Sequence, residues 1–497
     1  MNNKKKVRLP GIIAAVCSGV IVVATAALCS GCLQKIPEEG LVEGAPWLLG
    51  TTLFQLKDFG YEQSEYFIKG KAHSYASAEP LTSDGRWNVE PVDEADFKTR
   101  IVVYRPTDPA RFNGTVLIEW LNVSGGTEAS SEWIMGHTEL IRSGYAWIGV
   151  SAQKAGIDGA GVTVLPVSLA LKKINPLRYR TLVHPGDKYS YDIFRLAAKA
   201  VLQPQNFKPL GDLEIERAIA AGESQSADYM LTYVNAIAPR ENLFDAYMIH
   251  SRLHGSAPLV PEAESVTLDL ASRASVQVRG DLDVPVLMLQ TETDMTVLGA
   301  YPDRQPDTDL FRLWEVAGTA HADRYVGSLG LTDRGDNPKV ANVVETRYAI
   351  PLLAKCDKPV NSGPQHFAVN AAISALDGWL RTGVAPTPAD RFVFDDTAAL
   401  IRDWVGNALG GIRSPYVDAP IAALSGEGQT GSLFCSLYGT TKLFDSATLA
   451  SLYPDHETYV KAVRGSVDAA VEKGFLMEPY GQLIKTWAKN SNIGKPE

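Results

Sequence analysis

A strand, a tight turn and a helix follow one another without a break within residues 214–235. The apolar run 218–221 leads into the pentapeptide GESQS (222–226), and an amphipathic segment follows directly. This pattern is typical of a nucleophile elbow, in which a strained turn lifts the hydroxyl of Ser224 clear of a sheet edge. The usual pattern is G-x-S-x-G, and here Ser226 replaces the last glycine. A buried serine at an ordinary strand-to-helix turn is the alternative, and the pentapeptide alone does not decide between them.

Strand-like and helix-like segments alternate from about residue 60 to residue 380. This alternation predicts an α/β fold with a mainly parallel central sheet and helices on both faces, a core that we place at residues 51–385. Two long segments without clear periodicity, 152–183 and 250–283, interrupt the alternation and are expected to form walls or lids over a site. The expected strands are 66–72, 99–104, 114–121, 145–151, 218–221, 244–249, 284–290 and 310–316, and the expected helices are 131–143, 191–202, 227–234 and 365–380.

The character of the chain changes at residue 386, where turn residues become frequent. Helical spacing returns at 447–452, 456–473 and 481–489. No clear linker separates this part from the core. We therefore expect residues 386–497 to form a mostly helical C-terminal extension that packs on the core.

A serine nucleophile needs a base, and the base needs an acid to orient it. On a sheet of this kind the order along the chain is serine, acid, histidine. The strand 284–290 ends in a turn that holds Asp294, our predicted acid, and its rival Glu292. His321 follows the last strand behind a small-residue turn and is the predicted base. Without a catalytic role, either carboxylate would be a loop residue that caps the next helix.

Two backbone N–H groups are needed to stabilise the negative charge that develops on the substrate oxygen. The first candidate is Gln225, which follows the serine at a helix N-terminus. The second comes from the glycine-rich loop after 114–121, where the candidates are Asn122, Val123 and Ser124. An ordinary strand-to-helix turn is the alternative interpretation of that loop.

The remaining pattern argues against several other kinds of chemistry. The spacing of His250 and His254 would allow a metal site, but no carboxylate lies between them as it does in H-E-x-x-H. We therefore expect no metal and no other cofactor. The net charge is −10, and four positive charges precede Cys32, so the chain from Cys32 onward carries −14. This acidic balance argues against nucleic acid as a partner.

Residues 1–32 have the pattern of an export signal: a positive start, an apolar run from residue 11 to residue 28, and small residues before Cys32. The stretch before Cys32 resembles a lipobox, which predicts lipidation of this cysteine and a membrane attachment. Cleavage to a soluble chain and an uncleaved anchor are the alternatives, and all three place the protein outside the cytoplasm. Residues 33–50 are expected to be a tether. Cys356 and Cys435 would then be able to form a disulfide, or else remain as two buried thiols.

Taken together, these motifs resemble one known family, the bacterial α/β-hydrolase domain proteins, whose members are similar to serine esterases. The resemblance implies an α/β-hydrolase fold that includes the extension, a serine hydrolase activity, Ser224 as nucleophile and His321 as base. It does not supply a substrate. The matching stretches are 114–126, 184–194, 222–237, 291–294, 317–321 and 406–415.

The sequence thus predicts an extracytoplasmic serine hydrolase that cleaves a small-molecule or lipid-like carboxylic ester through an acyl-enzyme. Amides, lactones and polyesters would use the same three residues. The main alternative is a catalytically silent copy of the fold that binds a partner at the cell surface. A metal-dependent hydrolase that uses His250 and His254 is the third hypothesis.

Overall fold

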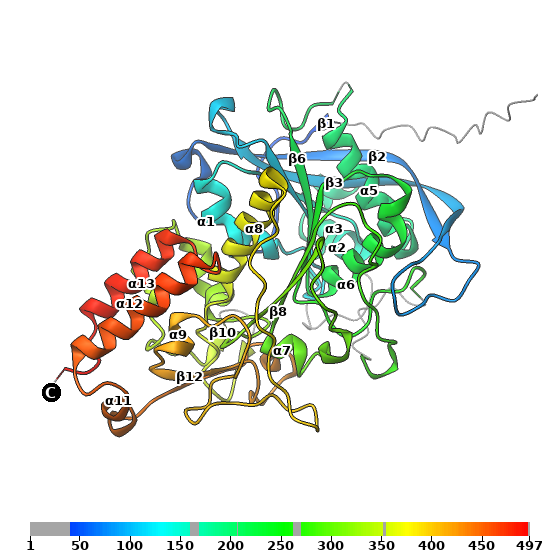
Figure 1. The fold of residues 1–497 in the computed structure, drawn as a ribbon. Helices are drawn as coiled ribbons and strands as arrows, with labels where there is room; N and C mark the ends of the chain where they lie inside the picture. Colours follow the sequence, from blue (N-terminus) through cyan, green and yellow to red (C-terminus); the bar gives the residue numbers. More distant parts are fainter. Residues whose placement is uncertain (1–39, 160–167, 206, 262–269, 351–353, 496–497) are drawn as a thin grey trace, which may run out of the picture. The chain divides into compact units, whose positions relative to one another are not determined.

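A nine-stranded sheet runs through the centre of the molecule (Figure 1). The computed structural model describes residues 40–159, 168–205, 207–261, 270–350 and 354–495, which belong to one compact unit, Ile36–Glu497. The predicted signal, residues 1–32 with Cys32, lies outside the described residues. The strands are β1 (Gly40–Leu41), β2 (Tyr61–Ala76), β3 (Glu90–Pro106), β4 (Thr115–Trp120), β5 (Ala146–Val150), β6 (Arg217–Glu223), β7 (Ala246–His250), β8 (Val286–Thr291) and β9 (Phe311–Val316).

The sheet has a parallel part and an antiparallel part. Its order is β1-β2-β3-β5-β4-β6-β7-β8-β9, and every neighbouring pair from β5 to β9 is parallel. The pairs β1–β2, β2–β3 and β3–β5 are antiparallel. Strands β4, β5, β7 and β8 are buried along their whole length, as their continuous apolar runs indicate. The predicted fold class, an α/β fold with a mainly parallel sheet, is confirmed.

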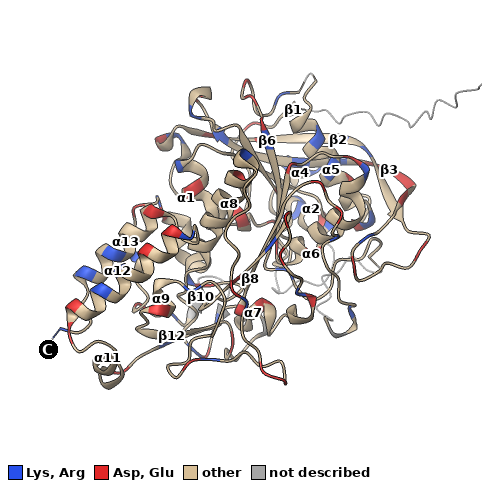
Figure 2. Ribbon diagram, in the orientation of Figure 1, with Lys and Arg blue, Asp and Glu red and all other residues tan. Residues whose placement is uncertain are grey.

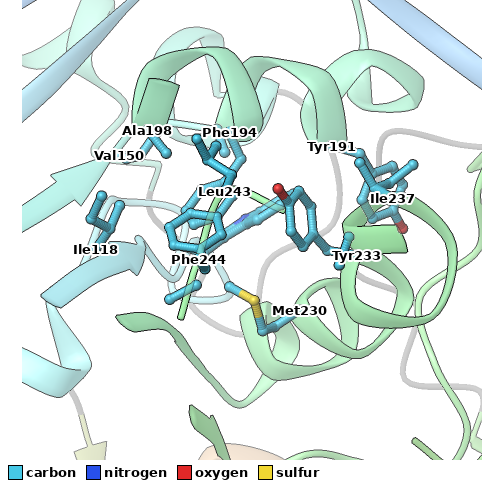
Figure 3. Packing of buried hydrophobic residues seen from close by; sticks show 14 of the residues in the cluster. Ile118, Val150, Tyr191, Phe194, Ala198, Met230, Tyr233, Ile237, Leu243 and Phe244 are labelled. Atoms are coloured by element: carbon cyan, nitrogen blue, oxygen red, sulfur yellow. The ribbon is translucent and has the colours of Figure 1, made fainter. Parts of the chain in front are cut away.

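Helices cover both faces of the sheet, and neighbouring residues of one strand show how the faces divide. Leu117 on β4 packs in a cluster with Trp133 of α1 and Val369 of α8. The next residue, Ile118, faces the opposite way and packs in a cluster with Phe194 of α5 and with α6 (Figure 3). Because side chains alternate along a strand, one apolar strand supplies both cores. The helices are α1 (Ser131–Arg142), α5 (Ser190–Leu202), α6 (Gln225–Thr232) and α8 (Gln365–Thr382).

The antiparallel part of the sheet is longer than the sequence predicts. The expected strand 66–72 is the middle section of β2, and 99–104 lies near the C-terminal end of β3; the two strands form one long hairpin. Outside the predicted sections polar residues interrupt the apolar pattern: buried and more exposed residues intermix along β2, and the first five residues of β3 are all exposed. Apolar runs alone therefore mark only the part of each strand that is covered on both faces.

The described residues of the first long segment, after β5, form three short helices: α2 (Lys154–Asp158), α3 (Leu171–Ile174) and α4 (Pro176–Tyr179). The acid candidate lies on another short helix, α7 (Glu292–Met295), directly after β8. Two short antiparallel pairs complete the strands, β10 (Ala349–Ile350) with β11 (Ala354–Lys355) and β12 (Ala422–Ser425) with β13 (Thr440–Leu443).

The C-terminal part of the chain packs on the core. Ile412 forms a parallel bridge with Val316 at the end of β9, so the extension continues the edge of the sheet. Along α12 and α13 acidic and basic residues are interspersed, as expected for helices with one face in water (Figure 2). The helices here are α9 (Pro415–Asp418), α10 (Leu433–Ser436), α11 (Ser446–Leu452), α12 (His456–Glu472) and α13 (Glu478–Asn490).

Two further features concern the N-terminal segment and the cysteines. From Gly40 onward the predicted tether 33–50 is docked on the fold: β1 pairs with β2, and Leu48 is buried. Cys356 and Cys435 are joined in a disulfide with their Cα atoms 5.6 Å apart. None of the helices in the described residues combines the length and the apolar character needed to cross a membrane.

Candidate active site

Ser224 stands at the turn between β6 and α6 with a strained backbone. Its φ of 59° and ψ of −127° lie in a region that non-glycine residues rarely occupy. The Ser224 N–H donates to the carbonyl of His250 at the end of β7, 2.9 Å away, and this bond fixes the turn to the neighbouring strand. The conformation is the one expected of a nucleophile elbow.

The residues two before and two after the serine explain why the elbow can form. A Cβ atom on Gly222 would lie 2.6 Å from the carbonyl oxygen of Ser226, so only glycine fits at this close approach. Ser226 stands where the usual pattern has glycine, and its side chain is fully buried. Its hydroxyl donates to the carbonyl of Leu121 at 3.3 Å. The structure thus accommodates the departure from the pattern by giving the extra hydroxyl a partner.

The structure brings Ser224, His321 and Asp294 into one hydrogen-bonded chain. Nδ1 of His321 lies 2.7 Å from Oδ1 of Asp294, and Nε2 lies 2.9 Å from the Ser224 hydroxyl. A carboxylate only accepts, so Nδ1–H donates to Asp294 and Nε2 accepts from the serine. All three residues are buried, with Ser224 8% exposed and His321 5% exposed.

The two carboxylates of the turn after β8 have different partners. Asp294 accepts the Thr291 N–H at 2.6 Å and His321 Nδ1–H, so its side chain is fixed on the base. Glu292 points elsewhere and accepts the Gly318 N–H at 2.7 Å. It also accepts the Gly426 N–H at 3.0 Å and a guanidinium N–H of Arg402 at 2.9 Å. Asp294 and not Glu292 therefore contacts His321.

Charge and burial act in opposite directions on the base and its acid. Burial lowers the pKa of His321, but the hydrogen bond and charge of Asp294 and the charge of Glu223 outweigh it, so this pKa lies above its usual value. Burial raises the pKa of Asp294, but the contacts with His321 and Thr291 bring it below its usual value. Each of the two groups thus stabilises the charged form of the other.

The four predicted N–H donors, in the loop after β4 and at Gln225, differ in whether they already have a hydrogen-bond acceptor. The Asn122 N–H donates to the Ala129 carbonyl at 3.0 Å, and the Ser124 N–H donates to Oδ1 of Asn122 at 2.8 Å. Among the described residues, the N–H groups of Val123 and Gln225 have no acceptor. Of the four predicted donors, these two are the ones left to bind a substrate oxygen.

His250 and His254 do not share a site. Nδ1 of His250 lies 3.2 Å from Glu132 in the core, whereas Nδ1 of His254 lies 3.0 Å from Asp303. No group of three potential ligands that could hold a metal ion occurs in the described part of the chain. The geometry therefore gives the third hypothesis no support.

Several residues around the base were not found from the sequence. The Asn361 side chain donates to the Gly318 carbonyl at 3.2 Å, and the Leu437 carbonyl accepts the Ala322 N–H at 2.9 Å. Both contacts hold the loop that carries His321, and neither residue lies in a recognisable motif. Glu223 also lies beside His321, and the signal for it was its place in the pentapeptide.

Comparison with known proteins gives the family. The family model described as alpha/beta hydrolase domain matches residues 34–486, nearly the whole chain. No protein among the curated sequences matches it. Solved structures that match include a thermostable esterase from Pseudomonas putida ECU1011, with 12% identity over 47% of this chain and 65% of that chain and a TM-score of 0.25.

Two further structures show similarly weak likeness. For the esterase Est22 the identity is 15% over 47% of this chain and 64% of that chain, with a TM-score of 0.26. For a structure from work on two prolyl endopeptidases it is 15% over 52% of this chain and 35% of that chain, with a TM-score of 0.27. The chain thus spans less than two thirds of each of these three proteins, and such values assign no activity to it. The match to the family model confirms the resemblance seen in the sequence: the chain belongs to the alpha/beta hydrolase domain family.

Proposed function

We propose that this protein is a serine hydrolase that cleaves carboxylic esters through an acyl-enzyme. The observation that carries the proposal is the hydrogen-bonded chain from Ser224 through His321 to Asp294. The strained turn at Ser224 and the membership of an α/β-hydrolase family support it. A serine held in this arrangement has both a base for its proton and a carboxylate that keeps the base in the right tautomer.

The geometry supports a reaction in two halves. The Ser224 oxygen attacks the ester carbonyl carbon while its proton passes to Nε2 of His321, and the negative charge moves to the carbonyl oxygen. The N–H groups of Gln225 and Val123 donate to that oxygen. The intermediate then expels the alcohol, which takes the proton from Nε2 and leaves an acyl group on the serine. Water repeats the same steps, and the acid product and free enzyme result.

We further propose that the protein acts outside the cytoplasm, held at a membrane through a lipid on Cys32. The export pattern of residues 1–32 supports this location. The disulfide between Cys356 and Cys435 supports it as well, since such bonds persist in oxidising compartments. A lipid-like ester with an acyl chain would be a suitable substrate for a protein held at a membrane.

The decisive experiment compares the chain from residue 33 onward with its Ser224→Ala variant on a panel of short and long acyl esters, amides and lactones. We expect ester hydrolysis that a chelator leaves unchanged and that falls by at least about 10³-fold in the variant. A fluorophosphonate should label the native chain on Ser224, as located by peptide mass spectrometry. The surface variant Ser466→Ala serves as the matched control and should keep full activity.

Two outcomes would overturn the proposal. Ester hydrolysis that persists in the Ser224→Ala variant would show that another residue carries the chemistry. Absence of hydrolysis on the whole panel, together with absence of labelling, would favour the alternative of a binding protein built on this fold.

A further inference from the structure

A second carboxylate approaches the base from the side opposite to Asp294. Glu223 is the last residue of β6, directly before the nucleophile, and only 6% of it is exposed. Its Oε1 lies 3.5 Å from Nε2 of His321. Its Oε2 accepts from the side-chain amide of Asn122 at 3.2 Å, and its backbone carbonyl accepts from the same amide at 3.1 Å. One side chain thus contacts both the base and the loop that follows β4.

We propose that Glu223 is a positioning residue that fixes His321 and the loop after β4, which carries Asn122 and Val123, relative to each other. We also propose that its negative charge stabilises protonated His321 during the reaction. The inference rests on the proposed function, because it assigns Glu223 a part in the same hydrolysis. It adds a residue that the arrangement of serine, acid and histidine does not require.

The first step of the argument concerns the proton on Nε2. In the resting site the Ser224 hydroxyl is the nearer partner of Nε2, at 2.9 Å against 3.5 Å for Glu223. Once the serine oxygen has bonded to the acyl carbon, Nε2 carries a proton. Glu223 is then the adjacent protein acceptor, and it faces this proton until the leaving alcohol takes it. An opposite charge at this distance favours the imidazolium form.

The second step concerns the loop. The amide of Asn122 donates to Glu223, and its Oδ1 accepts the Ser124 N–H at 2.8 Å. Glu223 therefore holds Asn122, and Asn122 in turn fixes the backbone around Val123. Since a donor must be preorganised to stabilise a transition state, this chain of contacts has a consequence for rate as well as for stability.

The charges around Glu223 come from three further elements. Burial has the largest effect on Glu223 and keeps its pKa above the usual value. His321 and His250, the latter on β7, lower this pKa, and Glu132 on α1 raises it. Asp294 on α7 and Asp228 on α6 act on His321 in the same sense as Glu223. A carboxylate buried at such a cost, beside a base, is more often found in functional sites than elsewhere.

The test measures kcat/KM against pH for the native chain, Glu223→Gln and Glu223→Asp. The rate should rise with pH as His321 loses its proton. Because Glu223 raises the pKa of His321, the Gln variant should move the midpoint of this rise to lower pH by about one unit. We expect the plateau to fall about tenfold as the loop loosens. The Asp variant keeps the negative charge, so the midpoint of its pH profile should lie close to that of the native chain.

Two controls separate charge from structure. Glu216→Gln removes the same charge from an exposed carboxylate just before the start of β6 and should change neither midpoint nor plateau. Asn122→Ala removes the contact with the loop but leaves the Glu223 charge in place. It should lower the plateau and leave the midpoint unchanged, and it remains informative if the Gln variant does not fold.

Failure of this inference is distinguishable from failure of the proposed function. If Ser224→Ala abolishes hydrolysis but Glu223→Gln keeps the native midpoint, the proposed function stands and the role of Glu223 is overturned. The same conclusion follows if the Asp and Gln variants shift the midpoint equally, since the charge would then not be its cause. If Ser224→Ala remains active, the proposed function fails instead.

Discussion

The proposed nucleophile, Ser224, and the proposed base, His321, meet at one hydrogen bond, but the two sides of the site are built differently. On the nucleophile side, Ser224 is held by its own strand and helix and by the adjacent strand through the His250 carbonyl. On the base side, the loop that carries His321 is held by the side chains of Glu292 and Asn361 and by the carbonyl of Leu437. The turn at Ser224 is set by the backbone of one strand and one helix, and contacts with Leu121 and Asn122 add to it. The loop that carries His321 has no such local frame and depends on contacts with segments more than a hundred residues away.

This difference has a physical consequence. The position of Ser224 follows from backbone geometry, so only changes that prevent the turn can move it. The position of His321 follows from several separate hydrogen bonds, among them contacts with the C-terminal extension through Gly426 and Leu437. We therefore expect the loop that carries His321 to tolerate the loss of one of these contacts, whereas a change that prevents the turn at Ser224 should displace the serine itself.

The largest effect should come from the acid, and it tests the difference within a single turn. Asp294→Asn should lower kcat by about 10⁴-fold, as loss of an orienting carboxylate does elsewhere, because the amide no longer fixes the histidine tautomer. Glu292→Gln makes the same chemical change two residues away. It should lower kcat by less than about tenfold and reduce the free energy of unfolding by about 2 kcal/mol, since it breaks a buried pair with Arg402.

Steady-state kinetics and thermal unfolding of both variants check this prediction. A large kcat loss for Glu292→Gln together with nearly native kcat for Asp294→Asn would contradict the assignment of Asp294 as the acid. Equal losses would instead show that the contact of Glu292 with Gly318 matters as much as the tautomer of His321.

The next largest effect should come from the elbow. In Gly222→Ala the new methyl group would meet the Ser226 carbonyl at 2.6 Å, so the turn must shift. We expect kcat to fall about 100-fold, as misplacement of a reacting group by about an ångström does, with a loss of stability of about 1–3 kcal/mol. The control is Gly465→Ala on α12, where the methyl group meets nothing within 4 Å. It should keep full activity and stabilise the helix slightly.

Activity assays and melting curves of Gly222→Ala and Gly465→Ala test this prediction. Native activity in a folded Gly222→Ala variant would mean that the close approach does not position the serine. The distinction between the two sides of the site would then fall.

The same difference explains what the sequence could predict. Ser224, its strand and its helix lie within about twenty residues, and periodicity over such a window reports local structure well. His321 and Asp294 were found because each follows a buried strand, and the carboxyl ends of parallel strands share one edge. The alternative acid, Glu292, shows the limit of this reasoning, since spacing alone does not tell which carboxylate of the turn contacts His321.

The contacts that brace the base could not be predicted in the same way. Asn361 and Leu437 act through backbone and amide groups, which any sequence offers in abundance. Ile412 lies beside β9 only because the extension folds back across the sheet edge. Such contacts join distant segments, and neither the spacing of apolar residues nor a sequence motif predicts them. The hairpin of β2 and β3 extends beyond the predicted strands for a related reason, because polar residues break the apolar pattern at the start of each strand.

The smallest effect on activity should come from the disulfide, and it sharpens the comparison most. The bond between Cys356 and Cys435 closes a segment with a separation of 79 residues, and Cys435 lies two residues before Leu437, which accepts the Ala322 N–H. Replacing both cysteines by serine should lower the free energy of unfolding by about 2–4 kcal/mol, because the unfolded chain gains freedom. Since Glu292 and Asn361 still hold the loop, kcat should fall only a few-fold.

Melting curves and kcat of the double variant, with and without a reducing agent, test this balance. Reductant should lower the melting temperature of the native chain to that of the variant and leave the variant unchanged. A loss of kcat as large as that of Gly222→Ala would contradict the claim that the base is held by several independent contacts. If stability falls while kcat is nearly unchanged, the disulfide to the extension contributes to the stability of the whole fold. The position of His321 then depends on the side chains of the core.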